Sequence, residues 1–140
     1  MLEAMLDFLA LCPSLADMDG EVDYSEMEAG WTLYDGGEEL EQVYWDGARR
    51  KKHSYSLEVR ANSGSSGQRI QNAQRMKAIG DWLLEQSELD QFPELGEGRI
   101  PLCIQCQSGA LGVMDPDGIS GTYHLQLYLI YEERGASLGS

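Results

Sequence analysis

Two cysteines in the second half of the chain, Cys103 and Cys106, have the short spacing of a metal-binding or redox pair. They lie in a stretch of alternating apolar residues, which predicts a strand, and residues three apart on a strand face opposite sides of the sheet. Two sulfurs that diverge in this way neither share a zinc ion nor close an easy disulfide. Because the chain has no second cysteine pair, we expect no metal site, no cofactor and reduced thiols inside a cell.

Alternating acids at Asp17, Asp19, Glu21 and Asp23 have the spacing of a calcium-binding loop. An EF-hand loop requires glycine at its sixth position and a bidentate acid at its twelfth, between two helices. Counted from Asp17, the sixth residue is Val22, and no helical pattern follows the segment. We therefore interpret it as a solvated acidic loop, with a weak cation site as the alternative.

Catalysis would most simply use one of the two histidines, His53 or His124, as a general base. Neither has an obvious catalytic nucleophile beside it in the sequence. The chain also lacks the Gly-x-Ser-x-Gly turn, the phosphate-binding glycine loop and the dinucleotide-binding glycine pattern. We therefore expect no enzymatic activity. A hydrolase, the alternative, would need His124 to meet Cys103 or a carboxylate in a pocket.

A compact basic cluster, Arg49, Arg50, Lys51 and Lys52, stands out in a chain with a formal charge of −14. Residues 1–48 contain thirteen of the 24 acidic residues and none of the ten Lys and Arg residues. Four cations could neutralise a few phosphates, but the net charge opposes approach to a polyanion, so we expect no sequence-specific nucleic-acid binding. Two oppositely charged zones suit a contact between copies of the same chain.

Apolar residues repeat along the chain with the periods of helices and strands. Leu2, Met5, Leu6 and Leu9 predict an N-terminal helix that ends before Pro13. The dipeptide Asp46-Gly47 predicts a tight hairpin turn with the basic cluster at its mouth. The other predicted elements are short strands at 31–34 and 41–45, a strand at 53–60, a helix at about 68–89, and strands at 100–106 and 123–131.

The predicted connections are short. Residues 62–67 predict a flexible connection, residues 109–121 a loop, and residues 135–140 a flexible tail. Gly80, inside the long helix, predicts the close approach of another element.

Strands joined by short turns favour one α+β domain over residues 1–134, with an antiparallel sheet of about four to five strands and both helices on one face. No apolar run is long enough to cross a membrane, so we expect no membrane partner.

Several short motifs follow Val43 in a fixed order. They are Tyr44-x-Asp46-Gly47, the strand residues Tyr55, Leu57, Val59 and Arg60, Gln71-Asn72, Trp82-Leu-x-Glu-Gln86, Phe92-Pro-x-Leu-Gly-x-Gly98, Ser108-Gly109-x-Leu111 and the alternating strand Tyr123 to Tyr131. In this order and spacing, about two thirds of the chain resembles the minor capsid proteins of long-tailed phages of Gram-positive bacteria. The N-terminal third matches only in outline, through Cys12-Pro13 and Val22-Asp23-Tyr24, and the basic cluster departs from the pattern.

The resemblance implies a virion protein similar in element order to tail-terminator and head–tail joining subunits, which form rings that cap the tail tube. It implies a location in the virion, and in the host cytoplasm during assembly. The implied partners are other copies of the chain, tail-tube proteins and head-connector proteins. The alternative is an acidic adaptor or inhibitor that binds a basic protein one to one.

A ring requires a heterologous interface, in which one surface meets a different surface of the next copy. We hypothesise that this interface joins the basic cluster to acids in the first 48 residues of the neighbouring copy. The residues are Arg49, Arg50, Lys51 and Lys52 on one side, and Asp17, Asp19, Glu21 and Asp23 on the other.

Overall fold

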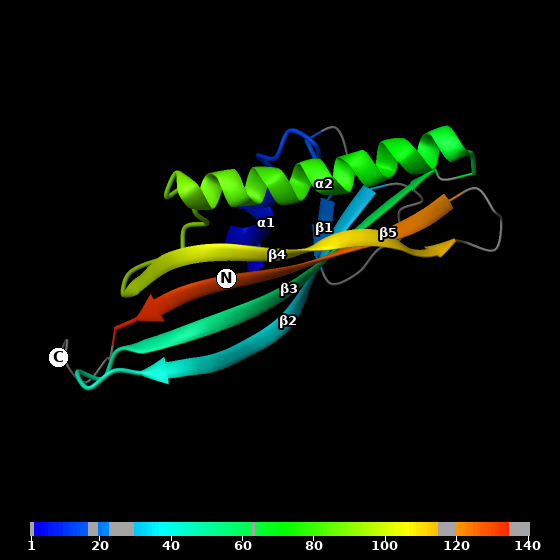
Figure 1. Ribbon diagram of the computed structural model, residues 1–140. Coiled ribbons are helices and arrows are strands. Elements are labelled where there is room, and N and C mark those ends of the chain that lie inside the picture. Colours follow the sequence, from blue (N-terminus) through cyan, green and yellow to red (C-terminus); the bar gives the residue numbers. More distant parts are fainter. Residues whose placement is uncertain (1, 17–19, 23–29, 63, 115–119, 135–140) are drawn as a thin grey trace.

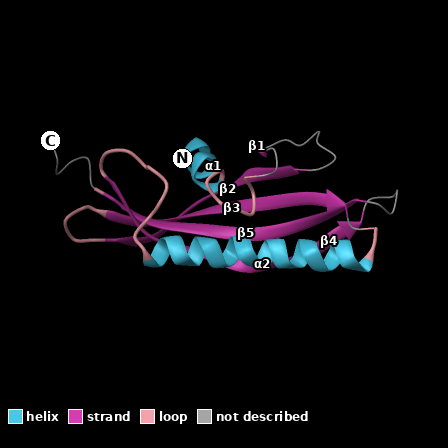
Figure 2. Cartoon of the chain, turned by 90° about the horizontal axis from the view of Figure 1, so that it is seen from above, coloured by secondary structure: helices cyan, strands magenta, loops and turns pink. Residues whose placement is uncertain are grey.

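The computed structural model describes residues 2–16, 20–22, 30–62, 64–114 and 120–134. A long, twisted sheet carries two helices on one face (Figure 1; Figure 2 shows the same chain from the helix side). This arrangement confirms the predicted α+β class, with one short N-terminal helix and one long helix.

The sheet has five strands in the order β1-β2-β3-β5-β4. β2, β3, β5 and β4 pair antiparallel, and the short β1 adds in parallel to the start of β2. The strand bounds are β1 Gly20–Val22, β2 Gly30–Val43, β3 Arg49–Asn62, β4 Arg99–Met114 and β5 Ser120–Glu133.

The core lies between the helices and one face of β3 and β5. Tyr55, Leu57 and Val59 of β3 alternate inward, opposite Leu127, Leu125 and Tyr123 of β5 in the register. Period-two alternation therefore buries one face of each strand, as the sequence predicted.

Helix α1, Leu2–Leu9, and helix α2, Ser66–Glu88, complete this core. α1 buries Met5, Phe8 and Leu9, and the Phe8 ring lies 5.1 Å from the Trp82 ring of α2, centroid to centroid. α2 runs along β4, so the element that approaches Gly80 is a strand. The Cys106 thiol of β4 lies 3.8 Å from the Gly80 carbonyl oxygen.

Four sequence predictions of element bounds were wrong. The acidic segment after Asp17, predicted as a loop, contains the strand β1 at Gly20–Val22. The segment 31–34 and residues 41–43 of the predicted strand 41–45 belong to one strand, β2, which passes Gly36 and Glu41 through register shifts instead of ending at glycine, and Tyr44 and Trp45 lie in the hairpin loop. Residues 109–114, predicted as loop, continue β4. Of the connection predicted at 62–67, Asn62 ends β3, and Ser66 and Gly67 already belong to α2. In each case pairing with a neighbouring strand, or a helix cap, overrides a local glycine, serine or acidic-residue signal.

The two helices do not cover the whole sheet. The hairpin of β2 and β3 extends past α1 and past the end of α2, at the lower left of Figure 1. Its cationic strand end is therefore presented beyond the helical layer.

Candidate functional site

Residues 44–48 form the loop of the β2–β3 hairpin, which confirms the turn predicted at Asp46-Gly47. The Tyr44 amide donates to the Ala48 carbonyl at 2.8 Å, and the Ala48 amide donates to Asp46 Oδ1 at 3.0 Å. Gly47 supplies the positive φ, +89°, that the turn requires. The Tyr44 hydroxyl donates to Glu132 Oε1 at 3.0 Å, which joins the loop to β5 and raises the pKa of Tyr44.

The four cations at the start of β3 have different surroundings. Arg50 Nε lies 3.3 Å from Glu41 Oε2 of β2, and Lys52 Nζ lies 4.2 Å from the centroid of the Tyr128 ring of β5. Arg49 is exposed and has no ion pair within the described part of the chain. Arg49 is therefore the cation of the cluster that is most available to a partner.

Lys51 is the centre of a line of charges that crosses four strands. Its Nζ lies 3.1 Å from Glu133 Oε1 of β5 and 3.5 Å from Glu38 Oε2 of β2. Arg99 Nε of β4 lies 3.3 Å from the other oxygen of Glu133. The hydrogen bond from Lys51, together with that from Arg99, outweighs burial and lowers the pKa of Glu133.

A second polar group, formed by His53 of β3 and Asp35 of β2, lies further along the hairpin from the turn than Lys51 does. His53 Nε2 lies 2.7 Å from Asp35 Oδ1, and the His53 ring stacks on the ring of Tyr55 at 4.6 Å. Burial raises the pKa of Asp35, but hydrogen bonds from the Gly37 amide and His53 outweigh it, so this pKa is lowered overall. Burial also raises the pKa of Tyr55, and it raises that of Tyr131, whose hydroxyl donates to Glu38.

The expected acidic partners of the cluster are mostly outside the described residues. Asp17, Asp19 and Asp23 lie there, and so does most of the loop considered for calcium. The backbone of Glu21 belongs to β1 at the edge of the sheet, on the far side of β2 from the cations. The predicted contact between these acids and another copy stays a prediction.

Sequence reasoning missed the acids of the same hairpin. Counting back from the Asp46-Gly47 turn in an antiparallel register places Glu38, Glu39 and Glu41 of β2 alongside the start of β3, and this signal could have been used. Three of the four cations, Arg50, Lys51 and Lys52, have a partner within the chain. The cluster stiffens its own hairpin as well as presenting charge.

The hairpin end also exposes apolar side chains. Trp45 is 99% exposed, and Leu40 and Val43 of β2 are more than half exposed. Contiguous exposed apolar patches mark interaction sites more often than single exposed apolar residues do. The sequence predicted a strand at 41–45 with Trp45 as its last residue, so the exposure of Trp45 in the loop was not predicted.

A hollow of about 400 Å³ lies at α1, where the chain leading from α2 to β4 passes it. Its apolar wall includes Phe8 and Leu11, and Leu11 is 70% exposed. Three carboxylate residues line it and, within the described ranges, no cation does. The lining residues are Glu3, Ala4, Asp7, Phe8, Leu11, Phe92, Pro93 and Glu94.

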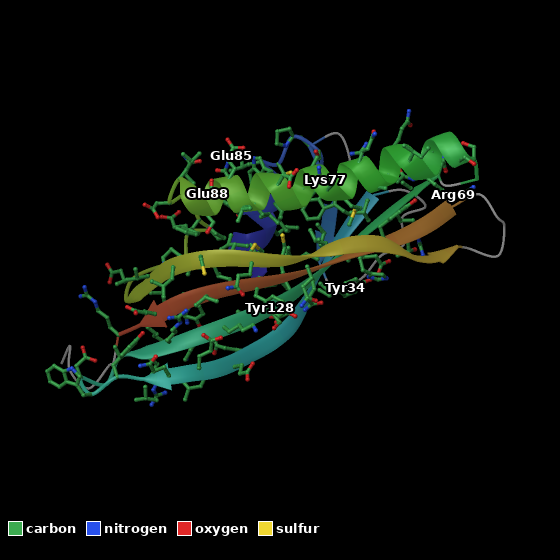
Figure 3. All side chains as sticks on the ribbon, viewed as in Figure 1. Tyr34, Arg69, Lys77, Glu85, Glu88 and Tyr128 are labelled. Atoms are coloured by element: carbon green, nitrogen blue, oxygen red, sulfur yellow. The ribbon has the colours of Figure 1, made fainter. Side chains whose placement is uncertain are left out.

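A larger groove, of about 490 Å³, lies between α2 and β4. Met76, Leu84 and Ile104 give it an apolar lining, and Lys77 and Asp81 give it one charge of each sign. Figure 3 shows Lys77 along α2 with Glu85 and Glu88, on the helix that stands above the sheet. Cys106 opens into this groove, and burial raises the pKa of its thiol, with Asp81 adding to the effect.

The residues considered for catalysis or metal binding do not converge. Cys103 and Cys106 follow an unshifted stretch of the β4–β5 register, so they face opposite sides, as predicted. His124 shares a face with Cys103 but lies six residues from Cys103's partner, Ile130, along β5, which is roughly 20 Å. The carboxylate residue opposite His124 is Glu58, on the exposed outer face of the sheet. The described residues contain no group of three or more His, Cys, Asp or Glu placed to hold a metal ion.

Among the described residues, no helix combines the length and the apolar character needed to span a bilayer.

Comparison with known proteins finds similarity at the level of structure. No family model matches the chain, and no curated protein matches it. Among solved structures, a chain described as "Virion of native gene transfer agent (GTA) particle" is similar, with a TM-score of 0.57 and 12% sequence identity. The match covers 88% of this chain and 85% of that chain. At this identity the similarity concerns the fold, and it extends over nearly the whole of both chains.

Proposed function

We propose that this chain is a structural protein of a phage-like virion, and that it acts as a tail-terminator or head–tail joining subunit in a ring of identical copies. The observation that carries the proposal is the shared fold with a chain from a gene transfer agent virion, which covers most of both chains. The ordered motifs from Tyr44 to Tyr131 support the same class independently, through their resemblance to minor capsid proteins of phages of Gram-positive bacteria.

The ring contact would join the cationic hairpin of one copy to the acidic N-terminal part of the next. Arg49, the exposed cation, would supply the charge that meets the neighbour, while Arg50, Lys51 and Lys52 hold the hairpin through Glu41, Glu38, Glu133 and Tyr128. Charge complementarity of this kind sets orientation and encounter rate, and salt screens it.

The remaining acidic charge would suit the inner wall of a ring through which DNA passes, because like charges repel. Tail-tube and head-connector proteins would be the other partners, in the virion and in the host cytoplasm during assembly. In this role the chain would perform no catalysis and would need no cofactor.

The experiment is done in the bacterial strain whose genome or prophage encodes the chain. A peptide tag is inserted at the C-terminal end, and purified particles are examined by immunoelectron microscopy. The proposal predicts label at the junction between head and tail, and unjoined heads and tails when the gene is deleted. Normal particles from the deletion strain, or particles without label, would contradict it.

A further inference from the structure

Trp45 does not contribute to the hydrophobic core of the chain. Its side chain is almost fully exposed at the end of a hairpin that passes beyond both helices (Figure 1). The loop that carries it is held by the Tyr44–Glu132 and Ala48–Asp46 hydrogen bonds, so the side chain is presented from a fixed backbone. Exposed Arg49 lies on the same hairpin end. Tryptophan and arginine are the residues most enriched among those that dominate binding at protein interfaces.

The hollow beside α1 offers the complementary features. Its apolar wall includes the exposed Leu11, and its lining includes Glu3, Asp7 and Glu94. A volume of about 400 Å³ is within the range of pockets that bind small-molecule ligands, which leaves room for an indole side chain. Three acids suit a guanidinium, whereas the groove between α2 and β4 has one charge of each sign.

We propose that Trp45 of one copy docks in the hollow beside α1 of the next copy, with Arg49 facing the acids that line it. This inference rests on the proposed ring and names the surfaces that form its repeated contact. The two surfaces differ, so each copy offers one and receives the other, and the contact is heterologous as a ring requires.

Pairing of sheet edges is a less suitable contact for this chain. The edge strand β4 has register shifts at Pro101/Cys103, Gln107/Ala110 and Leu111/Val113. The part of β2 that β1 leaves uncovered has two more, at Asp35/Gly37 and Leu40/Gln42. Bulges on edge strands twist the edge and oppose the addition of another strand, which leaves docking by side chains.

The contact is tested by cross-linking two variants of the full chain, both made in a background that carries Cys103→Ser and Cys106→Ser, because these native thiols are free and not fully buried. Ala48→Cys places a thiol beside Trp45, and Ala4→Cys places one in the hollow. The two proteins, one carrying a size tag, are mixed at high concentration and low salt with a short bismaleimide. We expect a mixed dimer at least tenfold more abundant than in a mixture of Ala48→Cys with Lys77→Cys, which labels the other groove. Adding Trp45→Ala to the Ala48→Cys protein should reduce the yield by a similar factor.

Light scattering on the same samples separates this inference from the proposed function. An assembled oligomer that gives no excess of the Ala48–Ala4 product overturns the docking and leaves the ring. A chain that remains a 15.6 kDa monomer at every concentration overturns both. Equal cross-linking to both grooves also overturns the docking, because it indicates random collision.

Discussion

At the level of single residues, Lys51 has the most demanding position in the hairpin. It is the cation between Glu38 and Glu133, and its side chain is only 17% exposed. Lys51→Met leaves two carboxylates facing each other without it, so we expect the free energy of unfolding to fall by about 1–2 kcal/mol. Urea denaturation measures this, and Arg49→Met is the matched control, because an exposed side chain should change stability by less than about 0.5 kcal/mol. Equal effects of the two substitutions would refute the role given to Lys51.

Acid should weaken the same end of the sheet. The pKa of Glu133 is lowered in the folded chain by the hydrogen bonds from Lys51 and Arg99. A carboxyl group with a lowered folded pKa stabilises the protein above its unfolded value, ordinarily 4.5, and loses this contribution as pH falls through the folded value.

We therefore expect the unfolding free energy to decrease between about pH 5 and pH 3, and to decrease less in Glu133→Gln. The difference should be below about 1 kcal/mol, because the carboxylate is partly exposed and water screens it. Urea denaturation at a series of pH values measures the slope. An identical slope in wild type and Glu133→Gln would contradict the assignment.

At this scale the sequence was informative about types of residue and less so about their partners. The opposite orientation of Cys103 and Cys106 followed from alternation alone, and the register agrees. Glu133, one partner of Lys51, could not be found in this way, because it comes from a strand 82 residues away in sequence. Trp45 was missed because the strand ends two residues before it, which apolar pattern alone does not fix.

At the level of elements, α2 begins with a capping box that was not predicted from the sequence. Ser65 Oγ accepts from the Gln68 amide at 3.1 Å, and the Gln68 side chain accepts from the Ser65 amide at 3.2 Å. Ser65→Ala should lower the free energy of unfolding by about 1 kcal/mol. Ser66→Ala, one residue further on, is the control and should have less than half this effect. Thermal denaturation compares the two, and a larger effect of Ser66→Ala would contradict the assigned cap.

Two glycines should respond oppositely to alanine. A Cβ at Gly80 of α2 would lie 3.5 Å from Cys106 Sγ, an ordinary contact, so Gly80→Ala should stabilise the chain by about 0.5–1 kcal/mol through helix propensity. A Cβ at Gly36 of β2 would lie 3.1 Å from the Ser54 carbonyl oxygen, so Gly36→Ala should destabilise it by about 1–2 kcal/mol. Urea denaturation of both variants checks the two signs; the same sign in both would refute the packing assigned to these glycines.

The elements themselves were largely predictable. Strong alternation in β3 and β5 and helical spacing in α1 and α2 gave their types correctly, since each buries one face against the same core. The join of 31–34 to 41–45 was not predictable, because Asp35-Gly36-Gly37 has the composition of a turn. Pairing of β2 with β3 across a register shift keeps it extended.

At the level of the whole molecule, the sheet extends past its helical cover and presents a hairpin that combines rigidity, the exposed cation Arg49 and the exposed Trp45. The acidic hollow at α1 is a different surface of the same chain. A molecule with two unlike, complementary surfaces suits head-to-tail association of identical copies.

Negative-stain electron microscopy of the purified chain, with light scattering on the same samples, tests the proposed assembly most directly. At high concentration and low salt we expect closed rings of one copy number, with a mass that is a whole multiple of 15.6 kDa and decreases as salt is added. Monomers at every concentration and salt would contradict it.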